Sequence, residues 1–235
     1  TDQGLNAYIA SGVRCCHEST RAEDALAKMR LGQYAQLRYG SAWLDLPNLA
    51  AAITETGIDT RFANLISDDT HPHTLVANGH LDYILRKAVD CGIDVVRAIQ
   101  MMTINTATCF RMDNELGSIT PGKCADIVLL DNLEDLNVTR VLIDGEVVAE
   151  NGACTFPLAP FEYPAWVTHS MHLGCAIAPE TFRVEASADA AEGDAVCVRV
   201  IEVLPGSVPD REVRAALTVT DTVSCWQSAI WLAMK

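Results

Sequence analysis

The sequence is short of positive charge, and this deficit limits the partners that it can have. Its 235 residues include 17 lysines and arginines against 31 aspartates and glutamates, which gives a formal net charge of −14. Nucleic acids and anionic membranes require a basic surface on the protein that binds them. We therefore expect neither a nucleic acid nor a membrane as a partner, although acidity alone identifies no substrate.

Long apolar runs and paired cysteines are also missing. No apolar stretch approaches the roughly 20 residues of a transmembrane helix, and no signal-peptide pattern opens the sequence. The 9 cysteines include no CxxC pair, which argues against a zinc knuckle or a redox motif. Scattered cysteines in an odd number favour reduced thiols, so we expect a cytoplasmic protein.

What is present is an alternation of short apolar segments with helical patterns. The predicted strands are 13–16, 34–37 and 61–67. The predicted helices are 5–10, 21–31, 46–55, 78–90 and 95–107. Thr20 and Glu23 have the spacing of a capping box at the start of the second helix. Such an alternation is typical of parallel βα units and predicts an α/β fold.

The pattern changes after Thr108. A turn-rich link over 117–126 precedes a strand over 127–130, and the pair 138–143 and 146–149 predicts a hairpin around Asp144-Gly145. Further on the chain is richer in proline and aromatic residues and then shows alternating segments, such as 195–203 and 215–219. We therefore expect three parts, which are 1–115, 116–154 and 155–235.

Acidic and imidazole side chains gather after the predicted strands. Asp68 and Asp69 follow the third strand, and half of the 6 histidines lie between His71 and His80. The first strand runs into His17-Glu18. Parallel strands end at one edge, where α/β barrels build their active sites. The clustering predicts a hydrolytic, metal-assisted site.

Five motifs together resemble the bacterial adenine deaminase family of the amidohydrolase superfamily. They are His17-Glu18-Ser19, Arg38-Tyr39-Gly40-Ser41-Ala42, Ser67-Asp68-Asp69, Gly79-His80-x-Asp82 and Ala98-Ile99-Gln100-Met101-x-Thr103-x-Asn105-x-Ala107. The stretch from Gly117 to Ile127 resembles the link by which many amidohydrolases return to a small β domain. The resemblance covers roughly residues 4–152 and thins beyond about residue 161.

The resemblance implies a fold and an activity. The fold would be the C-terminal part of a metal-centred (β/α)8 TIM-type barrel, followed by strands of a small composite β domain and part of an α+β C-terminal domain. The activity would be hydrolysis of adenine to hypoxanthine and ammonia. The family's His-x-His pair on the first barrel strand has no counterpart here, because His71-Pro72-His73 follows the aspartates instead. We therefore expect a fragment that begins midway through the barrel and associates with itself or with the missing half.

The resemblance also implies roles for single residues. Metal ligands would be His17 and Asp68. Catalytic groups would be Asp68, Asp69 and Glu18. Substrate-binding or supporting residues would be Arg38, Ser41, His71 and His80. The cofactor would be a divalent metal, manganese before iron or zinc. Imidazole and carboxylate groups by themselves suit all three metals.

Plainer interpretations remain open at each position. Asp68 and Asp69 fit a helix cap, where acids are favoured. His17 fits a structural histidine, Arg38 a salt bridge at the rim, and His80 a residue that orders its loop. For the whole chain, the alternatives are another amidohydrolase that acts on a cyclic amide, such as a dihydroorotase-like enzyme, and a catalytically inactive truncated fragment.

Overall fold

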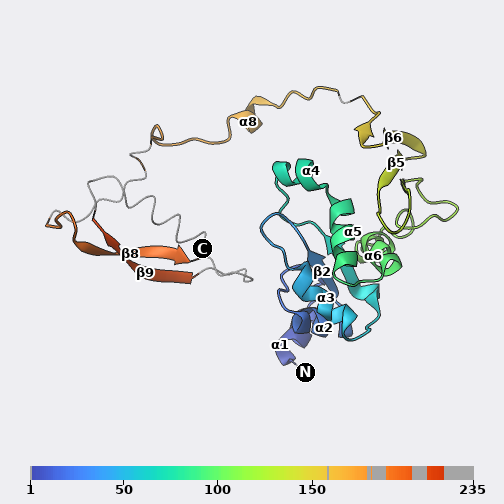
Figure 1. The fold of residues 1–235 in the computed structure, drawn as a ribbon, viewed down its shortest axis with the longest axis horizontal. Coiled ribbons are helices and arrows are strands. Elements are labelled where there is room, and N and C mark those ends of the chain that lie inside the picture. Colours follow the sequence, from blue (N-terminus) through green and yellow to red (C-terminus); the bar gives the residue numbers. More distant parts are fainter. Residues whose placement is uncertain (1, 158, 179–180, 182–188, 203–210, 220–235) are drawn as a thin grey trace. The chain divides into compact units, whose positions relative to one another are not determined.

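The structure is a computed structural model that describes residues 2–157, 159–178, 181, 189–202 and 211–219. It divides into two compact units, Thr1–Leu158 and Ala159–Lys235, and each is described by itself. The first unit contains the helices α1 to α7 and the strands β1 to β7, and the second contains α8, β8 and β9 (Figure 1).

The first unit is organised by a parallel sheet of three strands in the order β1-β2-β3. The strands are β1 (Cys15–Cys16), β2 (Tyr34–Arg38) and β3 (Ala63–Ile66), and they follow the helix α1 (Gln3–Ala10). The crossover helices are α2 (Ala22–Arg30) between β1 and β2, and α3 (Leu46–Thr54) between β2 and β3. The predicted mixed α/β fold is confirmed, since parallel neighbours joined through helices form βα units.

The two faces of this sheet differ in character. Ala35, Leu37 and Leu65 lie on the face that packs into the apolar core formed with α2, α3 and the later helices. The opposite face carries Gln36 and Asn64, which pair in register and are both buried. Residues of a strand alternate between its two faces, so Arg38 lies on the same polar face as Gln36.

The helices after β3 are shorter than the sequence predicts. The helix expected at 78–90 begins three residues later, as α5 (Leu81–Asp90), and a separate helix that the sequence did not predict, α4 (Pro72–Asn78), precedes it. They are separated at Gly79, whose φ of 98° is incompatible with a continuing α-helix. The helix expected at 95–107 is divided into α6 (Val95–Met102) and α7 (Ile104–Cys109).

Two predicted boundaries are wrong for local reasons. Thr20 does not cap α2, because the N-cap is Arg21 and no side chain accepts a hydrogen bond there. The strand expected from 61 begins with a 3-10 turn, η1 (Thr60–Phe62), which Asp59 caps by accepting a hydrogen bond from the backbone N–H of Arg61.

A second sheet completes the first unit. It is antiparallel, in the order β4-β5-β6-β7, with strands β4 (Ile127–Leu130), β5 (Val138–Ile143), β6 (Glu146–Glu150) and β7 (Ala153–Cys154). The predicted hairpin is present, and its turn residues Asp144 and Gly145 have φ of 51° and 83°. Two positive φ angles in succession are the signature of a tight two-residue hairpin turn.

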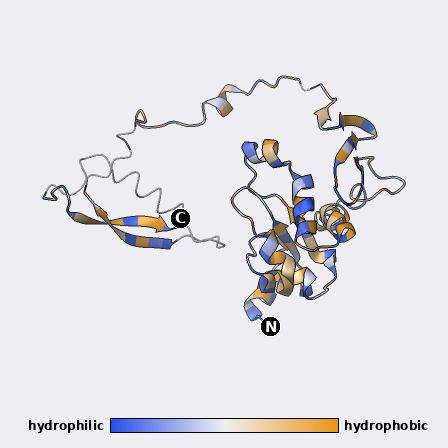
Figure 2. Cartoon of the chain, in the orientation of Figure 1, coloured by the Kyte–Doolittle hydropathy of each residue, from blue (hydrophilic) through white to orange (hydrophobic). Residues whose placement is uncertain are grey.

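The second unit contains a short helix, α8 (Ala165–Thr168), and an antiparallel pair, β8 (Ala195–Glu202) and β9 (Arg211–Thr218). Along β8 exposed and half-buried residues alternate. Both hydrophilic and hydrophobic residues occur in this pair of strands (Figure 2). Among the described residues of the whole chain, no helix is both long and apolar enough to span a membrane. The cysteines of the described part are free.

Replacing Leu37 by alanine should destabilise the first unit. Leu37 is fully buried at the centre of the apolar core, and such a truncation removes packed atoms and leaves a cavity, at a cost of about 2–5 kcal/mol. Chemical denaturation of the purified variant measures the loss. Leu129→Ala is the matched control, because Leu129 is 43% exposed and its truncation should cost less than about 1 kcal/mol. Equal losses for both variants would contradict this description of the core.

Candidate functional site

The ends of the three parallel strands bring the predicted site residues together at one edge. His17 and Glu18 directly follow β1, and Asp68 lies two residues beyond the end of β3. His17 Nε2 lies 3.2 Å from Glu18 Oε1 and 3.6 Å from Asp68 Oδ1. The imidazole therefore stands between two carboxylates that are far apart in the sequence.

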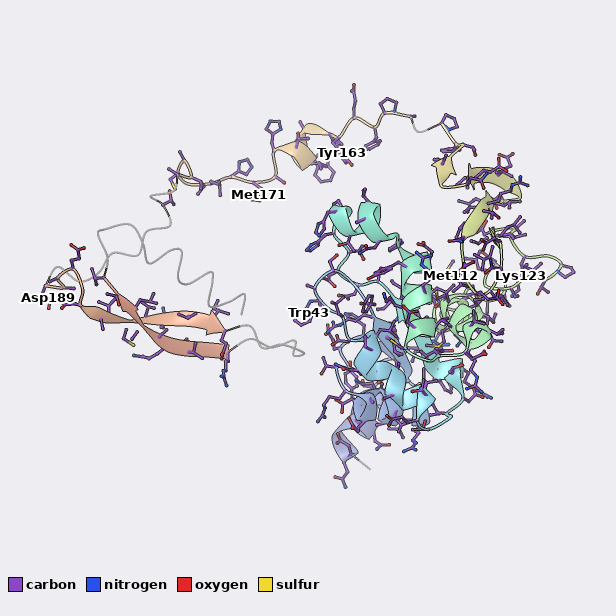
Figure 3. The ribbon with its side chains drawn as sticks, in the orientation of Figure 1. Trp43, Met112, Lys123, Tyr163, Met171 and Asp189 are labelled. Atoms are coloured by element: carbon purple, nitrogen blue, oxygen red, sulfur yellow. The ribbon has the colours of Figure 1, made fainter. Side chains whose placement is uncertain are left out.

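Arg38, the last residue of β2, is buried and contacts Glu18 of this group. Its Nη1 donates to Glu18 Oε2 at 2.8 Å, and its Nε donates to Asp45 Oδ2 at 2.7 Å. Its Cζ lies 5.0 Å from the centroid of the Trp43 ring, in the loop after β2 (Figure 3). Burial by itself would lower the pKa of Arg38, but the hydrogen bonds to Asp45 and Glu18 outweigh it and raise that pKa. The guanidinium is thus charged, paired and covered.

Asp69 joins the loops that follow β2 and β3. Its carboxylate accepts hydrogen bonds from the backbone N–H groups of Ala42, at 2.6 Å, and Trp43, at 3.3 Å. The helix-cap interpretation of the two aspartates is wrong, because α4 has His71 as its N-cap and no capping side chain. Asp69 instead fixes the neighbouring loop.

Asp68 has a backbone that few residues adopt without cost. Its φ is 61°, in the left-handed region that aspartate tolerates better than most residues. Its side chain is 22% exposed. This conformation leaves the carboxylate beside His17 and partly open to solvent.

The remaining predicted site residues order the loops. Ser41 Oγ accepts a hydrogen bond from the His71 backbone N–H and donates one to Thr74 Oγ1. His80 Nε2 lies 3.2 Å from Ser67 Oγ. The ring of His71 lies against that of His73, with their centroids 5.5 Å apart, and both residues are exposed.

Sequence reasoning missed Asp45 and Trp43 as partners of Arg38. Asp45 directly precedes Leu46-Pro47, a position where an aspartate is expected to cap a helix. It is indeed the N-cap residue of α3. Its side chain makes no capping hydrogen bond and turns to Arg38 instead. These contacts are visible only in the tertiary structure, because the sequence shows no recognisable pattern that links either residue to Arg38.

The donor atoms fit a divalent cation in part. An imidazole nitrogen and a carboxylate oxygen 3.6 Å apart are of the types that zinc, manganese and iron accept. Within the residues described, no group of three or more histidine, cysteine, aspartate or glutamate side chains is arranged to hold a metal. Catalytic zinc typically takes about three protein ligands. The two donors His17 and Asp68 are therefore fewer than such a site needs.

Comparison with known proteins finds similarity to one family model and to several adenine deaminases. Residues 44–148 match the model of the Amidohydrolase family. The chain is 57% identical over 221 residues to an adenine deaminase of Clostridium botulinum, which covers 94% of the chain and 36% of that protein. It is 45% identical over 219 residues to an adenine deaminase of Moorella thermoacetica, again with 36% of that protein covered. The chain spans about a third of the length of these relatives.

Solved structures show a weaker likeness. A β-aspartyl dipeptidase of Fervidobacterium islandicum AW-1 is 19% identical, with a TM-score of 0.48, over 63% of this chain and 41% of that one. An N-acetylglucosamine-6-phosphate deacetylase of Pasteurella multocida is 15% identical, with a TM-score of 0.43, over 62% of this chain and 52% of that one. Neither bears on the arrangement of the site residues.

Replacing Gly40 by alanine should disturb the loop that Asp69 fixes. A Cβ at Gly40 would lie 2.0 Å from Asp69 Oδ1 and 2.7 Å from the backbone oxygens of Ser67 and Asp69. Relieving such overlap should cost about 1–3 kcal/mol, measured by chemical denaturation. Gly174→Ala is the control, since nothing lies within 4 Å of a Cβ there. A fully stable Gly40→Ala variant would show that the close approach of these loops is dispensable.

Proposed function

From its resemblance to the adenine deaminases of the amidohydrolase superfamily, which the motifs predict and the comparisons confirm, we propose that this chain is part of a metal-dependent adenine deaminase. One structural observation carries the proposal: His17, Glu18 and Asp68 come from two different strand ends and meet within 3.6 Å. A hydrolytic site needs this kind of cluster of imidazole and carboxylate groups.

The fold that best accommodates these features is a section of a (β/α)8 barrel. Three parallel strands with a polar face and an apolar, helix-covered face fit a barrel wall, whose interior holds the site residues at the strand ends. In this proposal residues 1–115 belong to the barrel, 116–154 to a small β domain, and 155–235 to a C-terminal domain. The remaining strands would come from elsewhere in the protein or from an associated chain.

His17 and Asp68 would hold the divalent metal, manganese before iron or zinc. When bound, the metal would supply a hydroxide at neutral pH by lowering the pKa of water. Within the described residues, His17 Nε2 and Asp68 Oδ1 lie 3.6 Å apart and follow different strands. Further ligands would have to come from outside the described residues.

Asp68 is the best placed group for proton transfer. The reaction forms a C–O bond at the ring carbon that carries the amine, breaks the C–N bond and releases ammonia. A carboxylate that takes a proton from water and returns it to the departing nitrogen serves both steps. Asp68 is partly exposed and stands beside His17, whereas the Asp69 carboxylate is occupied by two backbone N–H groups. We therefore propose that Asp68 transfers the proton and that Asp69 stabilises the loop that follows β2.

Asp68→Asn should remove nearly all release of ammonia from adenine by the full-length protein. An amide cannot accept the proton that the carboxylate carries, and loss of general-base help costs about 10²–10⁴ in rate. The measurement is kcat for ammonia release, with folding checked by circular dichroism. Asp59→Asn is the matched control, because Asp59 lies on the surface and pairs with Arg61.

Two outcomes would change the assignment. If Asp68→Asn keeps kcat within a few-fold of wild type while Asp69→Asn abolishes it, the base is Asp69. If the wild-type protein hydrolyses dihydroorotate and leaves adenine intact, the chain is part of a cyclic-amide hydrolase and the proposed substrate is wrong.

His17→Ala should lower metal occupancy more than it lowers stability. The imidazole is 45% exposed at a strand end, so its removal leaves no core cavity, while the site loses a nitrogen ligand. Elemental analysis of the purified full-length protein measures the metal, and thermal unfolding measures stability. His169→Ala, at an exposed position in the second unit, is the control. Unchanged metal content with a lower melting temperature would make His17 a structural residue.

A further inference from the structure

Arg38 lies at the centre of an ion network that runs from β1 to α3. It joins Glu18, which follows β1, to Asp45 at the start of α3, through hydrogen bonds of 2.8 and 2.7 Å. The side chains of Arg38 and Asp45 are 2% and 5% exposed, whereas that of Glu18 is 47% exposed. The network therefore has a buried, fixed end and an exposed end at the site.

The guanidinium is too well covered to contact a substrate directly. Asp45 and Glu18 take its Nε and Nη1, and the ring of Trp43 lies over it. Its Nη2 is buried and has no hydrogen-bond partner among the described residues. Any effect of Arg38 on a reaction must therefore pass through the groups that it touches.

Glu18 is the group through which this effect would reach the site. One of its carboxylate oxygens is held by Arg38, and the other lies 3.2 Å from His17 Nε2. An exposed glutamate without partners samples several rotamers, because its side chain has considerable conformational entropy. With an oxygen engaged on each side, the carboxylate has a defined orientation against the imidazole.

We propose that Arg38 is a positioning residue: it holds the Glu18 carboxylate at the site, beside His17 Nε2 and Asp68. The inference rests on the proposed function, in which His17 and Asp68 form the reacting site. Asp45 fixes the guanidinium from behind, and Trp43 covers it. Removal of one partner of a buried ion pair is costly to the fold as well, so a structural role must be separated from positioning by experiment.

The separating variant is Arg38→Lys. Lysine keeps the positive charge beside Asp45, but its ammonium group is a single point donor and lacks the planar fork that reaches Asp45 and Glu18 from different nitrogens. Glu18 should therefore be released while the buried charge stays compensated. Arg61→Lys is the matched control, because Arg61 makes an exposed ion pair with Asp59.

The first measurement is the steady-state kinetics of the full-length protein with adenine. Arg38→Lys should lower kcat by about 10- to 100-fold with little change in KM, because a misplacement of about 1 Å can cost up to 10²-fold. Glu18→Gln should have a similar effect. The double variant should be no slower than Glu18→Gln alone, since both changes remove the same contact.

The second measurement needs no activity. Crystal structures of the metal-free wild type and of Arg38→Lys give the separation of Glu18 Oε1 and His17 Nε2, which should exceed the hydrogen-bond limit of about 3.5 Å in the variant. A variant with wild-type kcat, fully additive losses in the double variant, or an unmoved Glu18 would overturn the inference. If the wild type releases no ammonia from adenine, the proposed function fails, and the Glu18 position alone then decides the role of Arg38.

Discussion

The parallel register of β1, β2 and β3 is the constraint on which the rest of the site depends. Cys16 pairs with Ala35, and Ala35 pairs with Ala63, so the three strands end at one edge. Because side chains alternate along a strand, a slip of one residue would exchange the two faces. Leu37 would then leave the apolar core and Arg38 would enter it. The packing of the helices and the assembly of the site are thus fixed by the same register.

The polar face of the sheet explains why a charge is found so deep in the protein. A buried ion pair is weak support for stability, since desolvation offsets much of its attraction. Arg38 is nevertheless compensated by Asp45 on one side and Glu18 on the other, and its bond to Glu18 reaches the exposed edge. A network of this kind gives the site a fixed orientation, which loops by themselves would not provide.

The sequence predicts features that depend on neighbours in the chain. The alternation of strands and helices, the hairpin at Asp144-Gly145 and the gathering of His17 and Asp68 at one edge follow from local patterns and from the parallel arrangement. The separate helix α4 before Gly79 and the partners of Asp69 do not, because they depend on groups that meet only in the folded chain. The pairing of Arg38 with Asp45 was hidden for the same reason, since each residue has an ordinary local explanation.

We propose that His17 and Asp68, which the sheet register brings together, are ligands of one divalent metal. The most direct test is a crystal structure of the full-length protein prepared with manganese, with anomalous scattering recorded to locate the metal. We expect an anomalous peak bound by His17 Nε2 and Asp68 Oδ1. A peak at His71 and His73 instead, or full metal occupancy that involves neither His17 nor Asp68, would contradict it.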